Sequence, residues 1–255
     1  MDDEGRGIKA VHRLGAVVDL LRERGPLSTQ AVATELGVAK STAHAYLSAM
    51  AEIEYVVRRP EGYALSLKYL DYGMTMRARL PVVREAETTL EQLAADTSEA
   101  AYLVVEEHGR AVYVDYALGD RAVKTHARIG TRSPLHSLAS GKAILAYLPD
   151  ERVDEIVERR GLPALTENTI TDRSTLREEL AAVRERGYAV NQHEANEGTH
   201  AIGTPIIADD EVVAGLSVAG PANRVTLDRL EDEIAGEILA AANEIELMLA
   251  QPGPE

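Results

Sequence analysis

The stretch that most constrains the fold is residues 27–67, where two helical segments are joined by a tight turn. The first segment follows Ser28 and Thr29, which suit a helix N-cap, and it ends at Gly37, which tolerates a positive φ. In the second segment, one apolar face is formed at helical spacing by Ala43, Leu47 and Met50. Two helices joined in this way are typical of the helix-turn-helix, whose second helix can lie in a DNA major groove.

Residues 55–67 continue with two short alternating segments around Pro60-Glu61-Gly62, which predicts the β-hairpin of a winged helix. The polar side of the second helix carries no carboxylate before Glu52, so it can approach phosphates. The residues that we expect to contact DNA are Ser28, Thr29, Lys40, Ser41, Thr42, His44, Ala45, Arg58 and Arg59. Two plainer interpretations stay open: a helical hairpin in an unrelated core, and wing arginines that are solvated or paired with Glu61.

Charge is divided unevenly along the chain. The net charge is -15, which is unusual for a DNA-binding protein, but residues 1–80 hold 11 basic and 10 acidic residues, and residues 81–255 hold 16 and 32. The predicted DNA-binding part is therefore spared the acidity. The acidic excess, the scarcity of Lys and the absence of Phe and Trp resemble proteins of halophiles that accumulate salt, in which phosphate contacts are weakened.

The composition also excludes several classes of protein. Without Cys there is no disulfide framework, thiol chemistry or thiolate metal site. No run of 18 or more apolar residues occurs, so no membrane span is expected, and the acidic residues 1–6 are unlike a signal peptide. We therefore expect a cytoplasmic protein with no membrane partner and no cofactor.

We predict a winged helix-turn-helix over residues 1–68, a linker helix over 69–81, a second domain over 82–250 and a tail over 251–255. In the second domain, helical spacing predicts helices over 82–96, 140–147, 150–160, 172–186 and 226–249. A period of two predicts strands over 101–105, 111–116, 122–129, 188–192, 201–207 and 212–219. The predicted fold class is α+β, with a mostly antiparallel sheet and helices on its faces.

A resemblance to a known family rests on one motif and several shorter matches. The motif is residues 134–146, Pro-Leu-His-Ser-Leu-Ala-Ser-Gly-Lys-Ala-Ile-Leu-Ala, and the shorter matches are Gly187-Tyr188, Glu194, Gly198 and residues 217–221. Together they resemble the IclR family of transcription regulators, in the right order from about residue 7 to residue 249. The resemblance implies a GAF-like effector-binding domain, binding to palindromic operators as a dimer or a dimer of dimers, and repression or activation.

The resemblance also implies a pocket for a small effector, which we expect to be a carboxylate or a sugar acid. Its predicted lining is Leu135, Ala139, Ser140, Asn191, Ala201, Ser217 and Ala219. Ser140 is expected near a helix start, where free N–H groups and the helix dipole favour a carboxylate. This sequence departs from the family pattern at three positions: Asn191 replaces a common acidic residue, Ala201 an occasional Cys, and Ala45 a common Arg.

The sequence also bears on functions other than that of a regulator. Ser140-Gly141-Lys142 lacks the earlier Gly and the following Ser or Thr of a phosphate loop, and Ser137 beside His136 is no catalytic pair, so we predict no enzyme and no catalytic residue. A metal-responsive regulator stays open, with candidate ligands in a loop and two further histidines: His193, Glu194, Glu197, His200, His126 and His136. A protein-interaction winged helix with a vestigial sensor also stays open, and salt-dependent binding to promoter DNA would separate it from a regulator.

Overall fold

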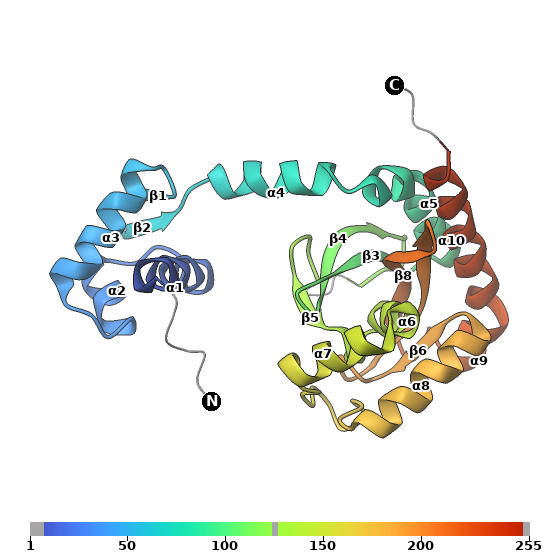
Figure 1. Cartoon of the computed structure of the whole chain (residues 1–255). Coiled ribbons are helices and arrows are strands. Elements are labelled where there is room, and N and C mark those ends of the chain that lie inside the picture. Colours follow the sequence, from blue (N-terminus) through green and yellow to red (C-terminus); the bar gives the residue numbers. More distant parts are fainter. Residues whose placement is uncertain (1–7, 124–126, 252–255) are drawn as a thin grey trace. The chain divides into compact units, whose positions relative to one another are not determined.

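The computed structural model describes residues 8–123 and 127–251. Its contacts divide the chain into two compact units, Met1–Met76 and Arg77–Glu255. Helix α4 (Lys68–Ala78) crosses this division, and each unit is described by itself (Figure 1).

The first unit is a winged helix-turn-helix. It consists of α1 (Lys9–Arg24), α2 (Thr29–Glu35), α3 (Lys40–Glu52) and the antiparallel hairpin β1 (Val56–Arg59) and β2 (Gly62–Leu65). One small apolar core joins them, formed by Val17, Leu21, Val32, Ala33, Ala43, Leu47, Met50, Val56 and Tyr63. Tyr63 also pairs through its backbone with Leu27, which fixes the hairpin to the loop before α2.

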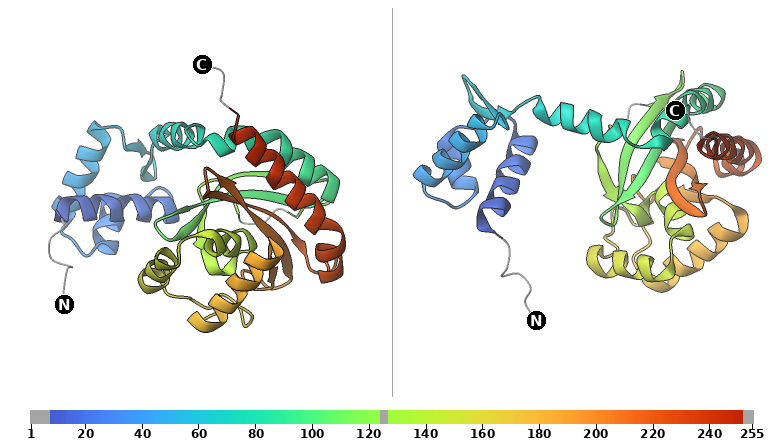
Figure 2. Two further views of the ribbon diagram at one scale, coloured as in Figure 1. Left: turned by 45° about the vertical axis from the view of Figure 1, so that its right-hand side comes forward. Right: turned by 45° about the horizontal axis from the view of Figure 1, so that its top comes forward.

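The second unit is built on an antiparallel sheet whose described strands run in the order β5-β4-β3-β8-β7-β6. The strands are β3 (Ala100–Glu107), β4 (Arg110–Leu118), β5 (Arg132–Pro134), β6 (Ala189–Gln192), β7 (Thr199–Ala208) and β8 (Glu211–Pro221). Helices cover both faces, as Figures 1 and 2 show. The predicted α+β class is therefore confirmed.

The two faces of the sheet carry separate apolar clusters. On one face, α5 (Pro81–Thr97) and α10 (Ala235–Leu249) pack side by side over the central strands. On the other, α6 (Ala139–Tyr147) lies against β7 and β8, with α7 (Asp150–Arg160) and α8 (Arg173–Arg186) outside it. Helix α6 is apolar on almost every side, which is why it is buried almost throughout.

Two predicted elements differ from the structure. The predicted strand 122–129 is wrong in its described residues, since 122–123 and 127–129 form no strand, and 124–126 lie outside the described residues. One edge of β4 pairs with β3, and the other edge pairs with β5, which precedes the short 3-10 helix Leu135–Ser137. The predicted helix 226–249 is interrupted: Leu227–Arg229 is followed by a π-helical turn, Leu230–Ile234, before α10 begins.

Candidate DNA-binding surface and effector pocket

The exposed side of α3 is free to meet a ligand. Lys40, Ser41, His44 and Ala45 are exposed, Thr42 is half-buried, and the opposite apolar side of the helix is buried in the core. Among the ion pairs between described residues, none uses Lys40, so its charge is available to an anionic partner.

The wing and the start of α2 are positioned by local backbone contacts. Arg58 and Arg59 are exposed on β1, and Glu61 forms no ion pair with either of them; Arg58 lies over the Tyr63 ring at 5.7 Å. Ser28 caps α2 by accepting a hydrogen bond from the Ala31 N–H at 3.2 Å, and Thr29 is half-buried beside it. Ser28, one of the residues expected to contact DNA, therefore also serves as the N-cap of α2.

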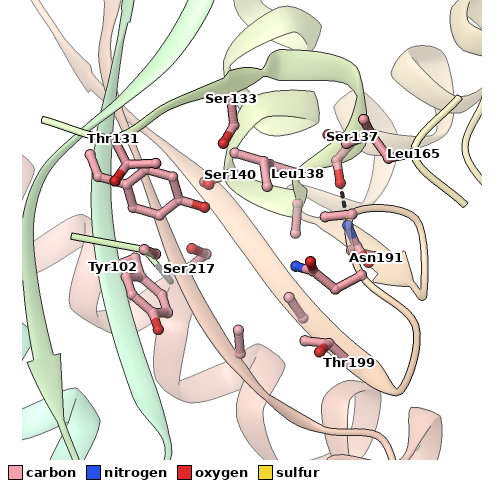
Figure 3. Close-up of a pocket in the computed structure, with 17 residues that line it drawn as sticks. Tyr102, Thr131, Ser133, Ser137, Leu138, Ser140, Leu165, Asn191, Thr199 and Ser217 are labelled. Atoms are coloured by element: carbon pink, nitrogen blue, oxygen red, sulfur yellow. Dashed lines mark hydrogen bonds between the residues drawn. The ribbon is translucent and has the colours of Figure 1, made fainter. Parts of the chain in front are cut away.

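One cavity of about 420 Å³ brings together most of the expected effector-binding residues (Figure 3). It is lined by Ala139, Ser140, Asn191, Ala201, Ser217 and Ala219, among others. Leu135 is not among the residues that line this cavity, and its side chain belongs to an apolar cluster that also includes residues of α6. The sequence prediction missed other lining residues, including Tyr102, Tyr113, Thr131, Ser133, Ser137 and Thr199.

The floor of the cavity depends on close packing of α6 onto the sheet. A Cβ at Gly203 of β7 would lie 2.4 Å from the Ser140 nitrogen, and one at Gly215 of β8 would lie 2.5 Å from the Ser140 carbonyl oxygen. Two glycines opposite the first turn therefore let the start of α6 approach the strands. Because no side chain caps this helix, its start offers backbone N–H groups and a positive dipole end.

The described lining of the cavity is more apolar than polar, and its polar side chains include no Lys, Arg, Asp or Glu. Its polar groups are hydroxyls and amides, and Figure 3 shows Ser133, Ser140 and Ser217 around the same space as Asn191. The rings of Tyr102 and Tyr113 meet edge to face at 5.5 Å. Burial and the neighbouring phenol raise the pKa of Tyr113 to about 12, so this hydroxyl stays protonated.

Asn191 is held in place by its neighbours. Its Nδ2 donates to the Ser137 carbonyl, and its Oδ1 accepts from the Glu194 N–H at 3.1 Å. The Glu194 carboxylate in turn accepts from Lys142 Nζ at 2.7 Å, and Lys142 also donates to the Val190 carbonyl. Lys142 is 1% exposed and bound internally, which removes it as a phosphate ligand.

The other candidate chemistries find no support in this geometry. Ser137 Oγ donates to the Pro134 carbonyl, and His136 Nε2 lies 3.2 Å from the Pro163 carbonyl, so the two side chains do not act together. His193 and His200 approach at 3.1 Å between their Nε2 atoms. In the part of the chain that the structure describes, which excludes His126, no three His, Asp or Glu side chains are placed to hold a metal ion.

Two family models match the chain. One describes the IclR helix-turn-helix domain and matches residues 10–60; the other describes the C-terminal domain of bacterial IclR transcriptional regulators and matches residues 74–247. The chain belongs to the IclR family. Members are DNA-binding transcription regulators with a C-terminal ligand-binding domain. No described helix is long and apolar enough to cross a membrane.

Relatives in the IclR family match the chain over most of its length. The transcriptional regulator KipR of Bacillus subtilis is 32% identical and covers 87% of this chain and 90% of its own. The probable regulator ArcR of Halobacterium salinarum is 31% identical and covers 96% and 95%. The crystal structure of Thermotoga maritima IclR is 29% identical with a TM-score of 0.75, and covers 95% and 98%.

A second solved structure is that of a separate ligand-binding domain, the kind of domain that the family model places in the second unit (Arg77–Glu255), which we call the sensor unit. It is the inducer-binding domain of the Acinetobacter transcription factor PobR, a double mutant in complex with 3-hydroxybenzoic acid. It is 31% identical with a TM-score of 0.59, and covers 63% of this chain and 95% of its own.

Proposed function

We propose that this IclR-family regulator binds a small hydroxylated carboxylic acid, a sugar acid above all, in the cavity at the start of α6, and that the acid changes its affinity for a palindromic operator. The observation that carries the proposal is the chemistry of the lining: hydroxyls and amides around an open helix N-terminus, without a charged side chain among the described residues.

A carboxylate is supported by the start of α6. Backbone N–H groups and the helix dipole stabilise an anion there without a basic side chain. Asn191 strengthens this preference, because an amide at this position adds no negative charge beside the acid. Hydroxyl groups on the ligand would pair with Ser133, Ser140 and Ser217, whose side-chain oxygens bond to no described residue. The 3-hydroxybenzoic acid complex of the PobR domain supports an acid of this size, and an aromatic acid is the competing ligand class.

Calorimetric titration tests the ligand class with gluconate, 3-hydroxybenzoate and their neutral counterparts glucose and 3-hydroxybenzamide. We expect gluconate to bind and glucose to bind at least about tenfold more weakly, because the carboxylate supplies the charge-assisted hydrogen bonds. Ser140→Phe should abolish binding by filling the cavity. Ser174→Phe is the matched control, since Ser174 occupies the exposed first turn of α8. Equal binding of the acids and their neutral counterparts would contradict the proposal.

The operator contacts are proposed for α3 and the wing. Lys40→Ala and His44→Ala should weaken binding to the chain's own promoter fragment by about tenfold or more while the fold is kept, since single base or phosphate contacts contribute about 1–3 kcal/mol. Circular dichroism checks the fold. The sensor-domain variant Ser174→Ala should leave the affinity unchanged. If neither α3 variant weakens binding, α3 is not the helix that contacts DNA.

A dimer is supported by large apolar side chains that the first unit leaves exposed. Leu67 is 79% exposed, and Ile8, Val11, Leu70 and Met74 are also exposed on α1 and α4 or beside them. Exposed apolar side chains in this number support an interface, and a second copy of the chain would supply the second half-site contact. Leu70→Glu should shift the sedimentation of the protein towards the monomer. Leu247→Glu, equally exposed on α10, is the control. A Leu70→Glu protein that sediments as the wild type would refute this interface.

The acidic composition supports the proposal that the protein functions at high salt concentration, as does the similarity to the Halobacterium salinarum relative. The binding measurements should therefore extend from low to molar salt.

A further inference from the structure

The pocket strand β4 contains an irregularity that the proposed function does not use. Leu103 of β3 pairs with Asp115, but the next residue, Val104, pairs with Tyr113. Val114 is therefore an extra residue opposite no partner, which defines a β-bulge. Bulges redirect side chains and release backbone groups from the ladder, and they are common beside functional sites.

Arg77, in the last turn of α4, contacts the two residues of this bulge, Val114 and Asp115. Its Nε donates to the Val114 carbonyl at 2.8 Å, and its Nη2 lies 2.5 Å from Asp115 Oδ2. The second carboxylate oxygen, Oδ1, accepts from the Tyr116 N–H at 3.0 Å. Both charged side chains are largely buried, with 23% of Arg77 and 12% of Asp115 exposed. We call this set of contacts the Arg77 latch.

The latch begins one residue away from the pocket. Tyr113, which precedes the bulge, lines the cavity with its ring. Its backbone N–H donates to the Thr131 carbonyl at 3.0 Å, and its carbonyl accepts from the Gly130 N–H at 2.8 Å. Thr131 also lines the cavity. A displacement of the pocket rim by a ligand would thus reach Val114 and Asp115 through consecutive residues of one strand.

The latch is also attached to the DNA-binding side of the chain by covalent continuity. Arg77 belongs to the sensor unit, but α4 continues without interruption back to Lys68, immediately after the wing. No residue of α4 is fully buried, and the printed contacts of its first turns are with the first unit, where Tyr69 packs against Tyr55 at 5.5 Å and Lys68 Nζ donates to the Ile53 carbonyl at 3.0 Å. In the last turn of α4, the guanidinium of Arg77 binds a carbonyl and a carboxylate together, which is a directional contact with the pocket strand.

We propose that Arg77 is the positioning residue through which the pocket strand controls the linker helix, so that its loss uncouples acid binding from DNA binding. The proposal rests on the proposed function for the acid-dependent part only. Arg77 touches neither the cavity nor the DNA-binding surface, so it acts through Val114 and Asp115. It should therefore change the coupling between the two sites and leave each site intact.

Two variants break the latch with little change in shape: Arg77→Gln and Asp115→Asn, the latter keeping an oxygen for the Tyr116 N–H. Arg177→Gln is the matched control, because Arg177 pairs with Asp154 at 2.8 Å on the exposed surface of α8 and α7. The readout is promoter-fragment affinity with and without saturating gluconate or 3-hydroxybenzoate. Where the wild type responds by about fivefold or more, as coupled sites typically do, both latch variants should respond less than about twofold.

Loss of the coupling should leave the effector pocket itself intact. The affinity of each latch variant for the acid should therefore remain within about threefold of the wild-type affinity. The double variant should be no worse than either single one, since the latch is already broken. A latch variant with full acid response, or one that merely weakens DNA binding with and without acid alike, would overturn the proposal.

A ligand-free measurement separates this proposal from the proposed function. The chain has no Cys, so spin labels can be placed at Asp71→Cys on α4 and Glu91→Cys on α5. The distance distribution should be broader in Arg77→Gln than in the wild type, and unchanged in Arg177→Gln. If neither acid binds, the proposed function fails but this comparison still decides the latch: a distribution in Arg77→Gln as wide as that of the wild type overturns it.

Discussion

Gly203→Ala should be among the most damaging single-methyl additions in the sensor unit. The added Cβ would lie 2.4 Å from the Ser140 nitrogen and 2.5 Å from the Ala139 carbonyl carbon, where ordinary contacts begin at 3.4 Å. These are backbone atoms of α6 and cannot rotate away. Either the helix start or strand β7 must therefore move by about 1 Å within a close-packed interior.

The magnitude follows from what must move. Overpacking a core typically costs about 1–3 kcal/mol, and the upper end applies because the obstructing atoms belong to two packed backbones. Gly236→Ala on α10 is the matched control, since its Cβ would meet nothing within 4 Å. That change should stabilise the helix by up to about 1 kcal/mol, because Ala favours helix over Gly. The same chemical substitution should therefore have opposite signs at the two positions.

Urea unfolding of the sensor unit, followed by circular dichroism, measures the change in unfolding free energy for both variants. The dependence of that free energy on urea concentration, m, should be the same as in the wild type. A loss of 3 kcal/mol corresponds to a fall in Tm of about 6–12 °C for a domain of this size. Gly203→Ala should also weaken acid binding, since the first turn of α6 forms the proposed anion site. A Gly203→Ala protein within about 0.5 kcal/mol of the wild type, the usual range for innocuous substitutions, would refute the packing argument.

Three further predictions concern titratable groups. Lys142→Met should cost about 3–5 kcal/mol at neutral pH, because it leaves Glu194 buried without its cation. Burial already raises the pKa of Glu194, so the folded protein favours the protonated acid, and the loss should shrink as pH falls; urea unfolding at pH 5 and 8 that shows equal losses would contradict this. Tyr113→Phe should remove one phenol that ionises near pH 12 from the absorbance titration at 295 nm. Hydrogen bonds from Thr175 and Ser174 lower the pKa of Asp172 to about 2, so its contribution to stability persists above its unfolded pKa and is lost as pH falls through about 2; a carboxyl NMR midpoint near 3.8 would disprove the cap.

The sequence predicted the fold well where local pattern and packing agree. The apolar face of α3 is buried as its spacing indicates, and the predicted helices 82–96, 140–147, 150–160 and 172–186 lie within a few residues of the observed bounds. It failed at residues 122–129, where an alternating pattern lies in a loop. A period of two shows that a segment could be a strand, but pairing depends on which neighbour has a free edge. That edge of β4 is taken by β5.

The pocket was predictable only in part. Ala139, Ser140 and the predicted strand positions line the cavity, because the family resemblance placed them, whereas Leu135 of the same motif does not. Tyr102 and Tyr113 were missed. The alternation of residues along a strand shows which side chains share a face of the sheet, but it does not show which face borders a cavity. Val114 illustrates the limit further: a bulge shifts the alternation by one residue, and nothing local in an apolar strand indicates where the extra residue lies.

The net charge of -15 is a poor guide to DNA binding because the cations of the two units are used differently. In the described sensor unit many arginines are bound internally; Arg224, for example, forms two hydrogen bonds with the fully buried Glu99. By contrast, Lys40, Arg58 and Arg59 are exposed and form no ion pair with any described residue. If a dimer presents these three cations twice, six neutralised phosphates predict a slope of about -5 for log affinity against log salt. A slope near zero would show that the affinity comes from base contacts and apolar burial, whereas a steeper slope would require cations from outside α3 and the wing.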